Sequence, residues 1–314
     1  MGSRPELDET YQQYIAGQTL DWSRLGYVQV VRERVELCSA VMMLSDLHRM
    51  RSPAQRVIMF PRLWLAEDEE AKKDPQTATT WRLLRTAARR YGVTLMPMEP
   101  IVEGADPESG SSYSLASIYS LAQFERVIYL QGPGVLLDAS ALDSLLAFSK
   151  SEPMAALPAT PGKKELSTCM MLVSPSKATF QQLKKLRTEN SLSDLDLFRT
   201  AFPAAESVMA EWSLSMGNVY YESQRLGEAV DDFNATAFEA STTFVRLLDA
   251  GMPGPEYDIP HSDRVKLRPK KLQAEEVWSR LYEGFRQQRM DVCGLDLEAM
   301  PVQQHGGVSS SGEA

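Results

Sequence analysis

The sequence predicts an α/β fold built on a mainly parallel central sheet that is covered by helices. Apolar runs of strand length alternate along the chain with stretches of helical periodicity, and this order is typical of parallel sheets. The chain has 314 residues, 43% of them hydrophobic, which is enough to enclose a large core. No stretch reaches the roughly 20 apolar residues of a membrane-spanning helix. We therefore expect a globular protein without a membrane segment.

The first half of the chain carries the alternating pattern. Runs rich in Val, Ile, Leu and Met are followed by stretches in which apolar residues recur at helical spacing. Consecutive strands that are joined by a helix pair in parallel, so this half predicts a βαβαβαβ unit. The strands are expected at residues 26–31, 56–60, 93–98 and 126–130, and the helices at 37–50, 81–91 and 114–124.

The second half continues the α/β pattern with insertions. Strands are expected at 168–173 and 242–248, and apolar residues at helical spacing from Val277 to Phe285 predict an amphipathic helix that docks on the domain. Proline and glycine predict two long surface loops. These loops are expected at residues 151–164 and 249–263.

We expect one domain over residues 22–295. The arm before it, residues 1–21, is polar and lacks periodicity, and the tail after it, residues 296–314, is rich in Gly and Ser. Such composition is typical of chain ends that are disordered.

Charge and cysteine content exclude several classes of function. The formal net charge of −9 argues against a general nucleic-acid binder. The three cysteines, Cys38, Cys169 and Cys293, are odd in number and far apart, so they suggest neither a disulfide framework nor a zinc site. With no signal-peptide pattern at the start, we expect a soluble protein in the reducing cytoplasm.

The stretch YLQGPGVLLDASALDSLL, residues 129–146, is punctuated by Gly-Pro-Gly but carries no obvious catalytic group. We interpret Gly-Pro-Gly as a turn, because no Walker or dinucleotide-binding motif surrounds it. Asp138 and Asp143 fit the start of a following helix. His48, His261 and His305 are too scattered to suggest a set of metal ligands.

Several stretches, in order and at similar spacing over roughly residues 20–295, resemble one enzyme family. They include LDWSRLGYVQVV (20–31), RVIMFPRLW (56–64), FERVIYL (124–130) and VWSRLYEGFRQQRMDVCG (277–294). They resemble family-8 glycosyltransferases, the glycogenin-like proteins of GT-A fold, and most of all the fungal branch called glucose N-acetyltransferase-like. The resemblance implies a GT-A-like, Rossmann-like central sheet in a single domain.

The resemblance also implies a nucleotide-sugar bound through a divalent metal, held by an Asp-x-Asp after the strand RVIYL and by a late His. In this chain the Asp-x-Asp position carries Gln131-Gly132-Pro133, and the His position carries Arg246. Neither an amide, an imide ring nor a guanidinium replaces such ligands. A phosphate-binding Lys of the family falls near Gly254. We therefore expect no metal and no cofactor.

Other positions that meet the nucleotide in the family also differ here. The Thr and Tyr after the first strand align with Arg32 and Glu36, and a Lys aligns with Leu115. Asp194 and Asp196 are retained as an Asp-Leu-Asp, and they either contact a ligand or cap a helix. Arg246 either pairs with a structural acid or anchors an anionic group of a ligand. The residues expected to bind substrate are Arg32, Leu115, Gln131, Pro133, Asp194, Asp196 and Arg246, with Gln131 and Arg246 as candidate catalytic donors.

Three functions are compatible with this pattern. The first is a metal-independent enzyme on a small, apolar substrate, with an intramolecular cyclisation or cycloaddition of the Diels-Alderase type in fungal secondary metabolism as its reaction. The second is a metal-independent glycosyltransferase that uses Arg32 and Arg246 to hold the diphosphate of a UDP-sugar. The third is a non-catalytic partner of another enzyme. No nucleic-acid partner is expected, and the sequence does not indicate an oligomeric state.

Overall fold

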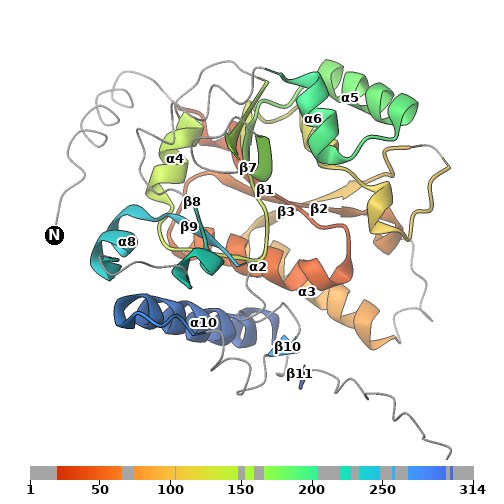
Figure 1. Cartoon of the computed structure of the whole chain (residues 1–314). Coiled ribbons are helices and arrows are strands. Elements are labelled where there is room, and N and C mark those ends of the chain that lie inside the picture. Colours follow the sequence, from red (N-terminus) through yellow and green to blue (C-terminus); the bar gives the residue numbers. More distant parts are fainter. Residues whose placement is uncertain are drawn as a thin grey trace, which may run out of the picture.

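A computed structural model describes residues 20–65, 74–102, 104–147, 153–158, 166–203, 220–227, 233–247, 257–258, 268–294 and 298–299. In this part of the chain the predicted α/β class is confirmed. A six-stranded sheet has the strand order β3-β2-β1-β4-β7-β6 (Figure 1). Strands β1 to β4 are parallel, and β7 and β6 form an antiparallel extension. The strands are β1 (Leu25–Val30), β2 (Gln55–Pro61), β3 (Val93–Met98), β4 (Arg126–Leu130), β6 (Met154–Pro158) and β7 (Leu166–Val173).

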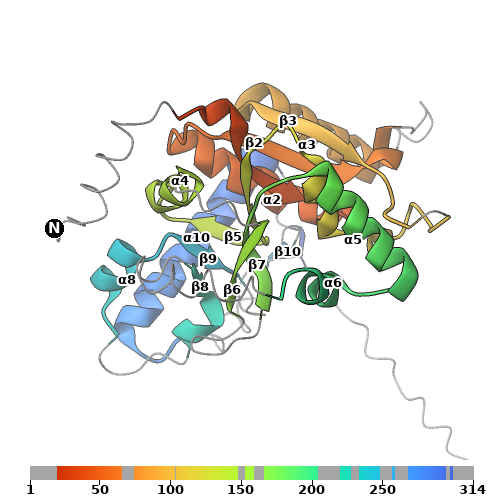
Figure 2. The ribbon, with the colours of Figure 1, turned by 90° about the horizontal axis from the view of Figure 1, so that it is seen from above.

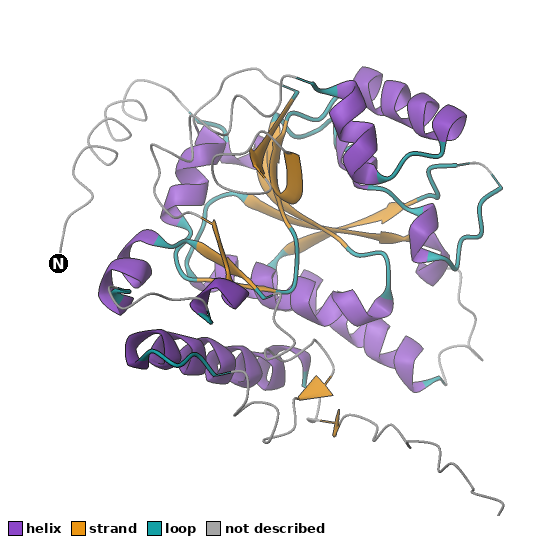
Figure 3. Cartoon of the chain, viewed as in Figure 1, coloured by secondary structure: helices purple, strands orange, loops and turns teal. Residues whose placement is uncertain are grey.

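Helices cover both faces of this sheet, and the sheet separates two apolar cores (Figures 1 and 3). One face packs against α2 and α3, and α10 forms a further layer outside α2 (Figure 1). The opposite face packs against α5, α6 and the 3-10 helix Leu115–Ser120. The α-helices are α2 (Arg34–Arg49), α3 (Pro75–Tyr91), α4 (Ser140–Ala147), α5 (Lys177–Asn190), α6 (Asp194–Ala201), α8 (Ala235–Ser241) and α10 (Leu272–Cys293).

Local sequence explains where the long helices begin and end. The Asp74 carboxylate accepts a hydrogen bond from the Thr77 N–H, and Pro75 stands at the first helical position, so α3 starts there. Gly92 ends α3 and Gly294 ends α10, each in the left-handed conformation that glycine adopts without a steric penalty. The C-terminal helix predicted around residues 277–285 is confirmed, and it extends over 22 residues.

A second, three-stranded sheet lies beside the main one and has the order β5-β9-β8 (Figure 2). Its strands are β5 (Gly134–Leu136), β9 (Phe244–Arg246) and β8 (Tyr220–Glu222). The Gly-Pro-Gly turn carries the chain from β4 of the main sheet into β5 of this smaller sheet. A Cβ atom at Gly134 would lie 2.3 Å from the Phe244 ring, so the two strands approach closely only because this residue is glycine.

Several predicted elements differ in the structure. The helix expected at 114–124 is a 3-10 helix over Leu115–Ser120, and the strand expected at 242–248 shortens to β9. The loop expected at 151–164 contains β6, and the described part of the loop at 249–263 is the two-residue strand β10 (Tyr257–Asp258). Strand β10 pairs with β11 (Glu298–Ala299) in the predicted tail. Residues 1–19 and 300–314, which make up most of the predicted arm and tail, lie outside the described residues.

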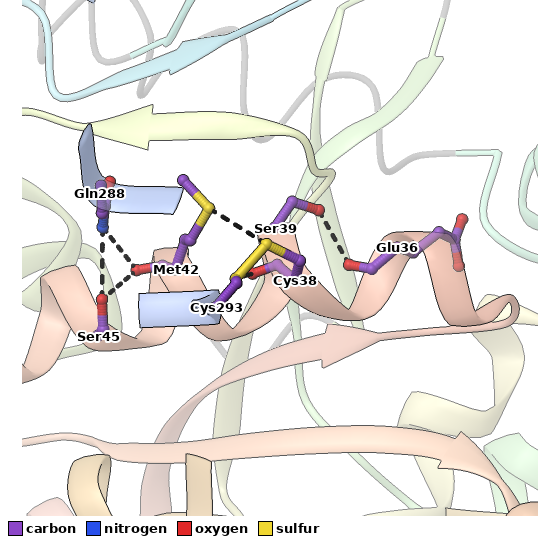
Figure 4. The surroundings of a disulfide bond; sticks show 7 residues. All are labelled: Glu36, Cys38, Ser39, Met42, Ser45, Gln288 and Cys293. Atoms are coloured by element: carbon purple, nitrogen blue, oxygen red, sulfur yellow. Dashed lines mark hydrogen bonds between the residues drawn. A yellow bond between two sulfur atoms is a disulfide. The ribbon is translucent and has the colours of Figure 1, made fainter. Parts of the chain in front are cut away.

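The prediction of unpaired cysteines is wrong for two of the three. Cys38 on α2 and Cys293 at the end of α10 form a buried disulfide across 255 positions of sequence, while Cys169 is free (Figure 4). Near it, the Gln288 amide of α10 donates to the Met42 carbonyl of α2 at 3.0 Å. A cytoplasmic location stays a prediction, and disulfides persist mainly in oxidising compartments. None of the described helices is long and apolar enough to cross a membrane.

Asp143 belongs to a buried hydrogen-bond network at the start of α4. Its Oδ1 atom accepts hydrogen bonds from the Tyr27 and Ser52 hydroxyls, both at 2.7 Å. Burial raises the pKa of the Asp143 carboxyl, because the charged form loses solvation. Asp138 instead accepts from the Ser140 N–H at the helix start, as predicted.

Candidate functional site

The parallel part of the sheet has a switch point between β1 and β4. From β1 the chain proceeds to β2 on one side, whereas β4 lies on the other side, so a crevice opens at the carboxyl ends of these two strands. Open α/β sheets bind ligands in this position. A pocket of about 390 Å³ lies here, and we name it the switch-point pocket. It is lined by residues between Gln29 and Ala40, by Leu115, by residues of the stretch from Tyr129 to Pro133, and by Thr168 and Asp194.

Five of the seven predicted site residues line this pocket, although they are spread over more than 160 positions of sequence. They come from four places in the fold: the end of β1, the 3-10 helix before β4, the turn after β4, and the start of α6. These residues are Arg32, Leu115, Gln131, Pro133 and Asp194.

The turn Gln131-Gly132-Pro133 forms one wall of the pocket. The Gln131 N–H donates to the Cys169 carbonyl at 2.8 Å, which continues the pairing of β4 with β7 for one residue. Gly132 packs against α2, where a Cβ atom would lie 3.2 Å from Ser39 Oγ. The Gly132-Pro133 peptide bond is cis.

These residues do not fit the divalent metal that the family resemblance implies. A hard cation prefers several anionic or carbonyl oxygens, and the turn offers one side-chain amide and a proline ring. Within the described part of the chain, no group of three or more His, Cys, Asp or Glu side chains is placed to hold a metal ion.

Asp194 lines the pocket and makes several charged and polar contacts there. Its carboxylate forms ion pairs with Arg32 from the end of β1 and with Arg187 of α5, the latter at 2.9 Å. It also accepts hydrogen bonds from the Ser114 hydroxyl and, at 3.2 Å, from the Leu115 N–H. Four donors from three elements thus converge on one carboxylate, which is 11% exposed. This arrangement fixes the Arg32 guanidinium beside the pocket.

Asp196 is placed differently from Asp194. It is not among the pocket residues, and its side chain is 57% exposed. The helix cap is Ser193, whose hydroxyl accepts from the Asp196 N–H and donates to the Asp196 carboxylate. Of the two predicted roles, contact with a ligand is therefore open to Asp194, which lies at the pocket. Asp196 instead supports the start of α6.

Arg246 does not line the pocket, and its described contact is not with an acid. Its Nη1 atom lies 2.6 Å from Cys169 Sγ, where the guanidinium donates to sulfur. The pKa of the nearby Tyr220 hydroxyl is raised mainly by burial and, to a smaller extent, by the neighbouring Cys169. We had expected Arg246 to pair with a structural acid or to anchor an anionic group of a ligand. Among the described residues, it contacts the Cys169 thiol instead.

Glu36 and Tyr129 are among the pocket residues that were not predicted to bind substrate. Glu36 lines the pocket and caps α2, since its carboxylate accepts from the backbone N–H groups of Arg32 and Glu33 at 2.6 and 3.1 Å. The Glu-x-x-Glu spacing at 33–36 was the sequence signal for this cap. Tyr129 also lines the pocket, and burial raises the pKa of its hydroxyl well above the ordinary range. Inside an apolar strand, Tyr129 gave no signal that distinguished it from a core residue.

Comparison with known proteins supports the family resemblance. The chain is 24% identical over 296 residues to the protein named glucose N-acetyltransferase 1 of Gibberella zeae, a match that covers 87% of this chain and 63% of the relative. It is 25% identical over 311 residues to the protein of the same name from Aspergillus fumigatus, covering 87% of this chain and 78% of the relative. The chain therefore spans less than two thirds of the Gibberella protein. No family model matches the chain.

Solved structures that resemble this fold include two glycosyltransferases. The glycosyltransferase GlyE of Streptococcus pneumoniae covers 84% of this chain and 63% of its own length, with 10% identity and a TM-score of 0.45. The galactosyltransferase LgtC covers 83% of this chain and 95% of its own length, also with 10% identity and a TM-score of 0.45. In sequence, the chain is similar to the two fungal proteins named glucose N-acetyltransferase 1, and its central sheet is of the α/β class.

Proposed function

We propose that this chain is a metal-independent enzyme that acts on a small organic molecule in the switch-point pocket. The observation that carries the proposal is the turn Gln131-Gly132-Pro133, which lines the pocket at the position where the family resemblance implies metal-binding carboxylates. A transferase-like scaffold has a substrate pocket, and this turn equips it with an amide donor in place of a metal site.

An intramolecular cyclisation or cycloaddition is the reaction that we propose, and a fungal secondary metabolite is the proposed substrate class. Such a reaction needs neither a nucleophile nor a metal, and an enzyme accelerates it by folding the substrate into a reactive conformer. The apolar part of the pocket wall, which would hold the folded substrate, includes Val30, Val35 and Leu115. The Gln131 amide and the Arg32 guanidinium are the donors that would polarise a carbonyl oxygen of the substrate.

A second candidate is glycosyl transfer from a UDP-sugar without a metal. The names of the Gibberella and Aspergillus relatives favour a transferase. In this alternative, Arg32 and Arg246 stabilise the leaving diphosphate. The contact of Arg246 with Cys169, outside the pocket, would have to rearrange for this role.

The two candidates are separated by product analysis and calorimetry. Under the first, the protein in EDTA converts a polyene or terpenoid precursor of its pathway faster than a protein-free control, and Gln131→Leu slows the reaction about 10- to 1,000-fold by removing one donor. Glu283→Gln, an exposed change on α10, is the matched control and keeps the wild-type rate. Rates equal to the protein-free control for every precursor would remove the first candidate. Absence of heat with UDP and UDP-sugars, with or without manganese, would remove the second.

A further inference from the structure

We infer that the switch-point pocket selects an uncharged or cationic ligand and rejects phosphate groups, because its described lining carries two carboxylates, Glu36 and Asp194, and only one guanidinium, Arg32. This inference rests on the proposed function, since it defines the charge of that enzyme's substrate. It concerns two carboxylates that both contact Arg32: Glu36 accepts from its backbone N–H, and Asp194 accepts from its guanidinium.

The charged side chains of the pocket are unequally divided. Among the described lining residues, Arg32 carries one positive charge, and Glu36 and Asp194 carry one negative charge each, so the sum is −1. Including Arg187, which pairs with Asp194 but is not among the lining residues, brings the sum only to zero. A diphosphate needs cations or a metal to offset at least two negative charges, and these groups supply none in excess.

The guanidinium of Arg32 is already paired. Its Nη2 atom donates to Asp194, a carboxylate that is 11% exposed and held in place by the Ser114 hydroxyl and the Leu115 N–H. A phosphate that bound Arg32 would compete with this internal carboxylate at short range. The remaining donor capacity of Arg32 suits a single neutral acceptor, such as a carbonyl oxygen.

The start of α2 is the second place where a phosphate would bind in many α/β proteins. Here, protein carboxylates already accept hydrogen bonds from this helix end. The Glu33 side chain accepts from the Glu36 N–H, and the Glu36 side chain accepts from the N–H groups of Glu33 and Arg32. The cap occupies the backbone N–H groups of Arg32, Glu33 and Glu36 at this helix end, and it places the negative charge of Glu36 beside the pocket.

The test is calorimetric titration with pyrophosphate and with UDP, in EDTA and at low ionic strength. The informative variant is Glu36→Gln, because glutamine keeps the acceptor for the helix cap while it removes the charge. We expect wild-type dissociation constants weaker than about 1 mM, and a gain of at least about tenfold in the variant, equivalent to about 1.4 kcal/mol. Glu283→Gln changes the net charge of the protein equally, is exposed on α10, and should leave binding unchanged. Asp194→Asn is a second variant for which we expect a gain, with its fold checked by thermal unfolding.

Two results would overturn the inference. One is wild-type binding of UDP or pyrophosphate in EDTA with a dissociation constant below about 0.1 mM. The other is a folded Glu36→Gln protein whose affinity for both anions stays at the wild-type level. The proposed function is scored separately, by turnover of a neutral precursor in EDTA. If Glu36→Gln does not bind the anions more tightly but the protein still converts a neutral precursor, only this inference is overturned. If the variant binds the anions more tightly but no precursor is converted, only the proposed reaction is overturned.

Discussion

Removing the Cys38–Cys293 disulfide should strongly destabilise the protein. The bridge joins α2 to the last residue of α10 and closes a loop that spans 255 positions, most of the domain. For a loop of this length, the chain-entropy relation gives about 5.5 kcal/mol at 25 °C, and native disulfides typically contribute about 2–5 kcal/mol. Because both sulfurs are buried, the double variant Cys38→Ala with Cys293→Ala removes the bridge and leaves little unsatisfied polarity.

Equilibrium unfolding in urea measures this effect. With a denaturant slope of about 3 kcal/mol per molar, a loss of about 3–5 kcal/mol lowers the midpoint by about 1–1.7 M. A reducing agent should produce a similar shift in the wild-type protein and none in the double variant, which serves as the control. Thiol titration of the unreduced, denatured protein should find one free thiol, Cys169, and three after reduction. Three free thiols without reduction, or identical midpoints, would refute the reasoning.

Three further substitutions test the packing and the buried polar network. Because burial raises the pKa of Asp143, the folded state holds this proton more tightly, and stability falls as pH rises from the ordinary carboxyl range through the folded pKa. Asp143→Asn keeps the Oδ1 acceptor, so it should remove this part of the pH dependence in urea titrations from about pH 4 to pH 8; an unchanged profile would contradict it. Gly134→Ala places a Cβ atom 2.3 Å from the Phe244 ring and should cost about 1–3 kcal/mol or more, measured by urea unfolding. Phe285→Ala on α10 empties a fully buried position and should cost about 3–5 kcal/mol in the same assay; a cost below about 1 kcal/mol would contradict the packing of α10 on the core.

The candidate site could be predicted from the sequence to a large extent, for a specific reason. The family resemblance implied Arg32, Leu115 and Gln131, and these residues line one pocket because the carboxyl ends of parallel strands meet at one edge of the sheet. Asp196 and Arg246 were predicted from the same family resemblance but do not line the pocket. A position in an alignment does not specify which way a side chain leaves its helix or strand.

The charge balance of the pocket could not be predicted in the same way. Glu36 and Asp194 are separated by 158 positions, and nothing local indicates that they flank the same arginine. Glu36 is placed by the start of α2, which directly follows β1, and Asp194 is placed by the start of α6, where it contacts Arg32 and the Leu115 N–H. Once they are placed, electrostatics decides which ligands the pocket tolerates.

By itself, the sequence determined the alternation of strands and helices in the first half of the chain, the mainly parallel class of the sheet, and the absence of carboxylates from Gln131-Gly132-Pro133. Each of these depends on periodicity or residue chemistry within a few positions, so each can be seen without coordinates. Only the tertiary structure decided the pairing of Cys38 with Cys293, the contact of Arg246 with Cys169, and the convergence on Asp194. Apart from the pair of Arg187 with Asp194, which are seven positions apart, these contacts join residues 77 to 255 positions apart. They depend on how helices and sheets pack against one another rather than on any local pattern.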